Sequence, residues 1–232
     1  TLSLHIWNEK PLGWLGIAKG PVMAGAEQFK VKITGRGGHG AMPDQTVDPI
    51  VAAANIVNAL QTIVSRNVAP LETAVVSVTT IHGGKAFNVI PQEVMLEGTI
   101  RTFDKRVRQR VIERFEQIAK SVGEAMGCQV EVQTERITPA LVNEASITEK
   151  IQNTARIVLP KSDLDMNGYI TMGAEDMAFM QDKVPGCYFF IGSSDASRHL
   201  DYGHHHPKFD FDEQALVNGV ALMATAATDL LK

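Results

Sequence analysis

Residues 48–66, DPIVAAANIVNALQTIVSR, decide the fold of the middle of the chain. Asp48 is a good helix N-cap and Pro49 suits the first helical position, so this segment is predicted to be a helix. Because its apolar residues recur at helical spacing, one side of the helix is expected to pack against a sheet. The predicted apolar face consists of Ile50, Ala53, Val57, Leu60 and Val64.

The segments around this helix predict a complete small domain. A second helix is predicted over 105–127, where apolar residues again share one side and Gly127 is placed to end the helix. The order βαββαβ predicts two helices on one face of a four-stranded antiparallel sheet, a ferredoxin-like domain over residues 25–138. The four predicted strands are FKVKITG (29–35), TAVVSVTTI (73–81), VMLEGTIRT (94–102) and QVEVQTERI (129–137).

The two flanking regions differ from this domain in their pattern of predicted helices and strands. Residues 1–7, TLSLHIW, predict a strand, and the prolines and glycines of 11–21 predict a connector. Residues 139–232 alternate helices with short strands such as CYFFIG, but contain too few strands for a closed doubly wound sheet. These regions are therefore expected to be part of a larger α/β domain, and the chain to be a fragment. The predicted helices lie near 144–159, 175–182 and 212–231.

Composition excludes several classes of protein. At about 150 residues per domain, 232 residues give roughly one and a half domains. A net charge of -4 gives no electrostatic footprint for nucleic acid, and no apolar run is long enough to span a membrane. Cys128 and Cys187 are too far apart for a metal motif and are expected to be free buried thiols. A cytoplasmic protein is expected.

Four polar residues in the first 101 positions are candidates for chemistry. A lone strand histidine such as His5 is more often a hydrogen-bonded core residue than a ligand. The glycines around His39 in GRGGHGAMP allow close backbone approach, so this loop could hold an imidazole toward a ligand or simply be flexible. Asn88 begins NVIP, where a turn role is also common, and Arg101 offers a carboxylate a bidentate fork.

The last third of the chain holds two further groups. Glu175 and Asp176 stand at a predicted helix start, where acids also complement the helix dipole. His204, His205 and His206 are consecutive on a loop bounded by glycine and proline. One of these imidazoles could bind a metal while the others hydrogen-bond or face water.

Nine segments in series carry a family resemblance. In chain order they are LHIWNEKPLG, GPVMAG, GRGGHGAMPDQTVDPI, ALQTIVSR, GGKAFNVIP, GTIRTFD, MGAEDMAFM, PGCYFFIG and HHHPKFDFDE. Their order and approximate spacing resemble the metal-dependent amidohydrolases that include aminoacylases, hippurate hydrolases and auxin-amino-acid conjugate hydrolases. This group is a branch of the aminoacylase/carboxypeptidase metallopeptidases, and the resemblance covers essentially the whole sequence.

The resemblance implies an α/β and α+β architecture. It suggests a mixed-sheet α/β metallopeptidase catalytic domain with an inserted ferredoxin-like lid or dimerisation domain. Residues 1–24 and 139–232 would be segments of the catalytic domain, and residues 25–138 would be the lid. Subunits would pair through the lid as a homodimer or a higher homo-oligomer.

The resemblance also implies roles for individual residues. His5 matches the metal-binding histidine of an L-H-[VI] motif, and His205, two residues before a proline, matches the histidine of H-x-P. His39 resembles a lid histidine that stabilises the oxyanion, commonly in the active site of the partner subunit. Asn88 and Arg101 resemble lid residues that contact the scissile amide region and the α-carboxylate of the substrate.

The implied reaction is metal-dependent hydrolysis of the amide bond in N-acyl amino acids. The implied cofactor is two divalent ions, with Zn, Mn, Ni and Co all compatible with imidazole and carboxylate ligands. The ions would activate a water molecule for attack on the acyl carbonyl. Four residues, Glu175, Asp176, His204 and His206, would surround the site without binding the ions.

Two departures from the family pattern limit this assignment. Pro43-Asp44 stands where the family commonly has Pro-His. The family's H-x-C-G-H-D segment and its paired glutamates, which supply further metal ligands and the general base, are not in the sequence and are expected upstream of Thr1. The chain by itself is therefore expected to be inactive.

Two other functions stay open. A dipeptidase or carboxypeptidase of the same family would differ only in what its acyl pocket accepts. A non-catalytic oligomerisation or binding module is the third alternative, because a ferredoxin-like domain often does no more than pair subunits or bind small molecules.

Overall fold

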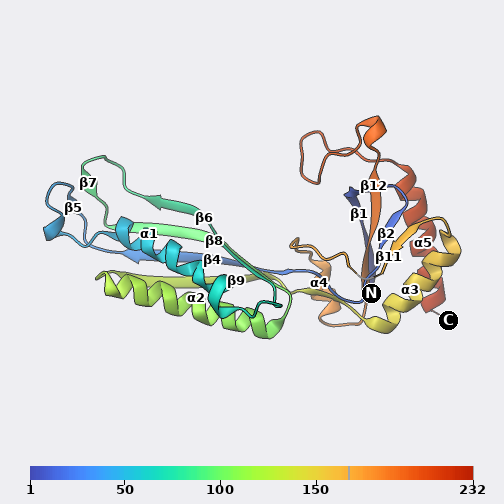
Figure 1. Cartoon of the computed structure of the whole chain (residues 1–232), viewed down its shortest axis with the longest axis horizontal. Helices are drawn as coiled ribbons and strands as arrows, with labels where there is room; N and C mark the ends of the chain where they lie inside the picture. The colour runs from blue at the N-terminus through green and yellow to red at the C-terminus, as the bar shows by residue number, and fades with distance from the viewer. Residues whose placement is uncertain (167, 232) are drawn as a thin grey trace. The chain divides into compact units, whose positions relative to one another are not determined.

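The computed structural model describes residues 1–166 and 168–231, which form two units. One unit combines Thr1–Ala24 with Ala140–Lys232, and the other is Gly25–Pro139. The chain therefore leaves the first unit once, forms the second, and returns to the first. Figure 1 shows the elements of both units along the chain.

The Gly25–Pro139 unit has the βαββαβ order predicted from the sequence. Its antiparallel sheet has the strand order β6-β8-β4-β9, and a separate pair, β5 (Gly38–His39) with β7 (Val89–Ile90), lies at one end (Figure 1). This is the strand order of a ferredoxin-like sheet, so the predicted fold class is confirmed. The main strands are β4 (Gly25–Thr34), β6 (Ala74–Gly83), β8 (Glu93–Thr102) and β9 (Gln129–Thr138).

Helix α1 (Pro49–Leu60) begins where the sequence predicts, because Asp48 Oδ1 accepts a hydrogen bond from the Ile50 N–H at 2.8 Å. Its predicted face was partly wrong, since Ile50 and Val64 are exposed. The α-helix ends at Leu60 and is followed by the short π-helix η2 (Ile63–Asn67), so Val64 leaves the predicted apolar face. Alanines let the helix approach the sheet closely, and its buried residues are Pro49, Ala52, Ala53, Ile56 and Leu60.

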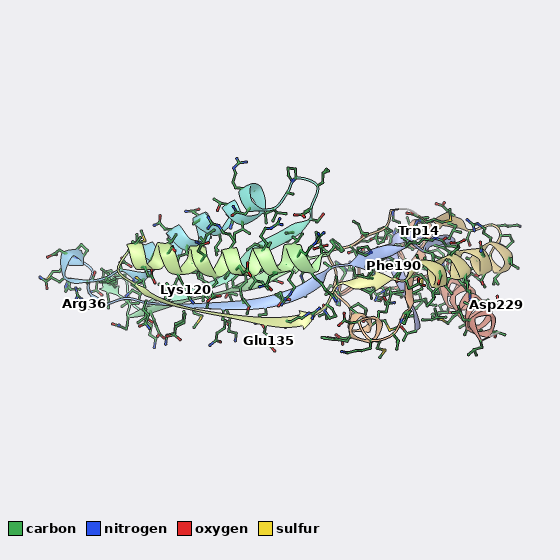
Figure 2. All side chains as sticks on the ribbon, turned by 90° about the horizontal axis from the view of Figure 1, so that it is seen from below. Trp14, Arg36, Lys120, Glu135, Phe190 and Asp229 are labelled. Atoms are coloured by element: carbon green, nitrogen blue, oxygen red, sulfur yellow. The ribbon has the colours of Figure 1, made fainter. Side chains whose placement is uncertain are left out.

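Helix α2 (Lys105–Ala125) follows its prediction more closely. Asp104 caps it, and Gly127 takes a φ of 76° just beyond its end, a conformation that favours glycine. Both helices contribute to one hydrophobic core with the sheet, and Figure 2 shows them on the same side of it, with Lys120 on α2 and Glu135 on β9. The predicted residues Val111, Phe115 and Ile118 are buried, and Val122 packs against the core.

One buried ion pair stabilises this unit. The Glu27 side chain in β4 is 3% exposed and accepts a hydrogen bond from Nε of Arg108, whose side chain is 28% exposed. We expect Arg108→Ala to lower the free energy of unfolding by about 2–3 kcal/mol, because it leaves the buried carboxylate unpaired, though partial solvation of the arginine reduces the effect. Urea denaturation measures this change. Arg110→Ala is the control, because its exposed pair with Glu72 is worth at most about 1 kcal/mol, and equal losses would contradict the prediction.

The other unit is built on a mixed sheet with the order β1-β12-β2-β11. Strands β1 (Leu2–Pro11) and β12 (Cys187–Ser194) are parallel, whereas β12 and β2 (Trp14–Gly16) are antiparallel. A second strand pair joins β3 (Gly20–Met23) to β10 (Leu141–Asn143). The remaining elements of this unit are β11 (Asp163–Asp165), α3 (Ala145–Val158), α4 (Met177–Gln181), the short 3-10 helix η3 (Ala196–Arg198) and α5 (Gln214–Leu230). Another short 3-10 helix, η1 (Pro43–Gln45), belongs to the Gly25–Pro139 unit.

Both faces of this mixed sheet are covered. Phe189 of β12 packs in a cluster with residues of α3 and α5, whereas Phe190, the next residue, packs with Trp7 and Trp14 in a second cluster. Figure 2 labels Trp14 and Phe190 among these packed side chains. Because successive strand residues face opposite sides, the run CYFFIG is buried throughout.

The connector predicted for residues 11–21 was wrong. This segment contains β2 and the start of β3, and Trp14, Leu15 and Ile17 are buried. Strand β2 has only three residues and is buried on both faces, so it shows neither the length nor the alternation that marks a strand in sequence.

Two expectations from composition can be compared with the structure. Cys128 and Cys187 are free and buried, as predicted. Burial raises the pKa of the Cys187 thiol to about 11, so this thiol stays protonated at neutral pH. Among the described residues, no helix has the length and apolar character needed to cross a membrane.

Candidate functional site

His5 lies midway along β1 and is half-buried. Its Nδ1 donates a hydrogen bond to the carbonyl of Ile6 at 2.5 Å, because a carbonyl oxygen can only accept. In the neutral ring this bond fixes the tautomer and leaves the Nε2 lone pair free. Histidines that bind metals commonly have this arrangement, with one nitrogen bonded to a carbonyl and the other facing the ion.

His204 is the member of the triple histidine that contacts His5. The three histidines lie on the segment 195–213 between β12 and α5, which we call the histidine loop. The His204 ring lies 5.1 Å from the His5 ring and 4.9 Å from Trp7, and its Nε2 accepts a hydrogen bond from the Asn8 N–H at 3.2 Å. Burial, followed by the nearby His5, lowers the pKa of His204, which favours the neutral ring that this acceptor role requires. Its Nε2 is therefore engaged.

His205 is the least engaged of the three. His206 stacks on Tyr202 with 4.6 Å between ring centroids and accepts a hydrogen bond from the Lys208 N–H. His205 is exposed and makes no hydrogen bond or ring contact with any described residue. Its φ of 64° lies in the left-handed region, which favours glycine and is strained for a residue with a side chain. Both of its ring nitrogens are free.

The described residues do not gather a complete metal centre. Across 1–166 and 168–231, no three His, Cys, Asp or Glu side chains come close enough together to hold an ion. His5 and His205 nevertheless each have a free imidazole nitrogen, which fits the chemistry of a divalent transition metal. These two residues could supply part of a ligand set.

Glu175 is linked to the surroundings of His5 through Tyr188. The Tyr188 hydroxyl donates a hydrogen bond to Glu175 Oε2 at 3.0 Å, and the Tyr188 ring lies 6.4 Å from the His5 ring. Burial, with a further contribution from the Glu175 charge, raises the pKa of Tyr188. Asp176 precedes α4 but makes no side-chain capping bond, and its N–H donates to Glu175 Oε1. Glu175 therefore anchors Tyr188.

His39 and Asn88 come together at one end of the other unit. His39 in β5 pairs with Val89 in β7, and the Gly40 N–H donates to the Asn88 carbonyl at 2.8 Å. A Cβ at Gly40 would lie 3.0 Å from that carbonyl oxygen, so this close approach favours glycine. The side chains of His39 and Asn88 are exposed, and the neighbouring Phe87 is fully exposed. We call this end of the unit the tip.

Arg101 lies far from the tip. It is near the end of β8, on the sheet face opposite the buried Ile100, and no hydrogen bond or ion pair holds its guanidinium within the described parts of the chain. Partial burial lowers the pKa of Arg101, but it stays fully charged at neutral pH. Eight residue steps along β8 separate it from Glu93, beside the tip, which corresponds to about 27 Å.

Two residues near His5 had no role predicted from the sequence, Asn8 and Tyr188. The side-chain partners of Asn8 include carbonyls 192 and more residues away along the chain, so no local pattern marks it. Tyr188 belongs to the apolar run CYFFIG and is indistinguishable there from a core aromatic residue. Only the fold shows that its hydroxyl is paired.

The comparisons with known proteins fit this architecture. Residues 24–126 match the family described as the M20 peptidase dimerisation domain. N-acetyl-L-cysteine deacetylase of Bacillus subtilis is 36% identical over 100% of the chain. The chain belongs to the M20 peptidase family. The resemblance inferred from the nine segments is therefore confirmed.

Other relatives show the breadth of this M20 group. An IAA-amino acid hydrolase, ILR1-like 4 of Arabidopsis thaliana, is 35% identical, and thermostable carboxypeptidase 2 of Saccharolobus solfataricus is 34% identical. These matches cover 99% and 98% of the chain but 53% and 57% of the relatives, so the chain spans about half their length. A Bacillus subtilis structure described as a dinuclear metal binding M20 peptidase has a TM-score of 0.80 at 29% identity, covering 99% of this chain and 56% of that one.

Proposed function

We propose that the protein hydrolyses the amide bond of N-acyl amino acids with the help of divalent metal ions. The observation that carries this proposal is the pair of free imidazoles at His5 and His205, on β1 and on the loop that packs against it. Relatives named as an N-acetyl-L-cysteine deacetylase and an IAA-amino acid hydrolase support this substrate class.

His5 and His205 would hold the metal ions in part. Imidazole nitrogen suits Zn, Mn, Ni or Co, and a catalytic site of this kind uses three or more protein ligands, of which these are two. Bound ions would lower the pKa of a water molecule and polarise the acyl carbonyl. The chain keeps His5 ready for this role, because the Ile6 carbonyl fixes its tautomer and the rings of Trp7 and His204 limit its rotation.

His39 would stabilise the negative charge that develops on the acyl oxygen. Its Nδ1 accepts a hydrogen bond from the Ala41 N–H at 3.1 Å, so the neutral ring carries its proton on Nε2. The exposed Nε2–H is therefore a donor suited to an oxyanion, and such a donor is worth about 3–4 kcal/mol in a transition state. The Asn88 amide, held beside it, would contact the same end of the substrate.

Arg101 would bind the substrate carboxylate through its bidentate fork. Since about 27 Å of strand separates it from the tip, no small substrate can touch both Arg101 and His39 of one chain. Arg101 pairs with Ala26, beside Gly25 where this unit begins, so it lies at the end of the sheet away from the tip. We infer that each site takes Arg101 from one subunit and His39 with Asn88 from its partner in a homodimer.

A carboxypeptidase or dipeptidase activity is the second candidate. It is supported by the 34% identity to a protein named thermostable carboxypeptidase 2. Comparing N-acyl amino acids with dipeptides that carry the same C-terminal residue distinguishes the two activities. Faster turnover of the dipeptides would favour the second candidate.

Metal removal tests the proposal itself. Dialysis of the full-length protein against a chelator is expected to lower turnover of N-acetyl and N-benzoyl amino acids by at least about 100-fold, because water activation is lost. Adding back Zn, Mn, Ni or Co separately should restore it to different extents, and released amino acid is the measured quantity. A panel of substrates that shows no chelator-sensitive turnover would refute the proposal and favour a non-catalytic binding role.

A further inference from the structure

Asn8 makes an unusual set of hydrogen bonds for one side chain. It is 1% exposed and lies three residues after His5 on β1. Its Nδ2 lies within hydrogen-bond distance of the carbonyl oxygens of Leu200 (3.3 Å), Tyr202 (2.8 Å) and Asp210 (2.9 Å). All three acceptors belong to the histidine loop, so one buried amide gathers the backbone of that loop onto β1.

The Oδ1 atom and the backbone N–H of Asn8 also have partners. Its Oδ1 accepts a hydrogen bond from the buried Ser193 hydroxyl at 2.8 Å, and its backbone N–H donates to His204 Nε2. The Ser193 bond fixes which side of the amide faces the loop, because the oxygen is committed to the serine. The two Nδ2 hydrogens must therefore point toward the carbonyls of the loop.

The anchors lie on both sides of His205. Tyr202 is three residues before it and Asp210 is five residues after it, so the short arc between them is closed at its base by one side chain. Within this arc His205 keeps its strained left-handed conformation. Such a conformation persists only where the surrounding structure determines it, and the Asn8 bonds are the buried contacts that tie both limbs of the arc to β1.

We propose that Asn8 is a positioning residue that holds the arc 203–209, and with it the His205 imidazole, in a fixed place relative to His5. This inference rests on the proposed function, because His5 and His205 are taken as metal ligands. Asn8 itself does not touch the ion or the substrate. Its contribution is that the second imidazole is in place before the metal binds.

Substitution of Asn8 tests this role in the full-length protein. Asn8→Ala removes every side-chain bond from Asn8 to the histidine loop. Asn8→Asp keeps the shape and the Ser193 partner but replaces the donor nitrogen by an oxygen that faces carbonyls. Both variants are expected to bind Zn or Co about 10–100-fold more weakly in a competition titration with a chromogenic chelator. Backbone hydrogen exchange in 199–209 of the metal-free protein should also become faster.

Asn143 provides a matched control. It is 3% exposed, lies in the same unit, donates to the carbonyls of Ala18 and Tyr188, and accepts from the Tyr188 N–H. Among the hydrogen bonds of the described residues, none joins the Asn143 side chain to the histidine loop. Asn143→Ala is therefore expected to lower the thermal midpoint about as much as Asn8→Ala, but to leave metal affinity within about two-fold when measured well below that midpoint.

The outcomes separate the inference from the function on which it rests. Metal affinity and exchange that are unchanged in both Asn8 variants, with tight binding by the wild type, would overturn the positioning role alone. Equal losses of affinity in Asn8→Ala and Asn143→Ala would overturn it as well, because they would indicate general destabilisation. A wild-type protein that binds none of these metals would overturn the proposed metal site, and the positioning role with it.

Discussion

His205→Gly is expected to abolish turnover while leaving the fold intact. His205 is exposed and touches no other described side chain, so its removal costs no packing. Its φ of 64° suits glycine better than histidine, which should raise the free energy of unfolding by about 0.5–1 kcal/mol. Loss of the metal ligand that we propose at this position would remove several kcal/mol of transition-state stabilisation, so kcat/KM should fall by at least about 1,000-fold. Steady-state kinetics, metal content and thermal unfolding measure the three effects.

His206→Ala is the control for that experiment. It removes the adjacent imidazole, which stacks on Tyr202. Because such a stacking contact is worth at most about 0.5–1.5 kcal/mol of local stability, kcat/KM is expected to change by no more than about three-fold. This pair of variants tests whether the metal ligand is the histidine two residues before Pro207 or the histidine directly before it. Retention of full metal content by His205→Gly, or an equal loss in His206→Ala, would contradict the assignment of His205.

The parts of the fold that follow from local chemistry could be predicted from sequence. Asp48 and Pro49 mark the start of α1, and Gly127 marks the end of α2, because caps depend only on neighbouring backbone. The buried face of α1 could not be predicted as well, since alanines rather than the larger Ile50 meet the sheet. Strand β2 was missed because its burial is imposed by distant elements on both faces.

In the candidate site too, some features follow from local sequence and others depend on distant parts of the chain. Spacing within a motif selects His5 and His205, but it does not show that His204 packs on His5 or that its Nε2 is already bonded. That arrangement depends on Asn8 and on a loop almost 200 residues further along the chain. The pairing of the tip strands, which brings His39 beside Asn88, and the long separation from Arg101 likewise follow from the sheet register rather than from local sequence.

Because Arg101 lies far from the tip, two inactive variants are expected to restore activity when their subunits are mixed in one dimer. His39→Ala and Arg101→Ala are each expected to lower kcat/KM by at least about 100-fold, because the first loses the proposed oxyanion donor and the second the proposed carboxylate fork. If each site combines the two groups from different subunits, a mixed dimer has one site with both defects and one site with neither. Equal mixing and exchange of the two proteins should therefore restore about a quarter of wild-type activity, since half of the dimers are mixed and each has one intact site.

A second mixture controls for any general effect of mixing. His39 and Asn88 lie on the same tip, so both reach a given site from the same subunit. In a dimer of His39→Ala with Asn88→Ala, each site receives one defective tip, and no activity should return. Recovery in this mixture as well would indicate an effect unrelated to site composition. No recovery in the His39→Ala and Arg101→Ala mixture, with subunit exchange verified by mass, would contradict the shared site. Because about 27 Å of strand (about eight residue steps) also prevents one chain from bringing both groups to one small substrate, Arg101 or His39 would then lose its assigned role.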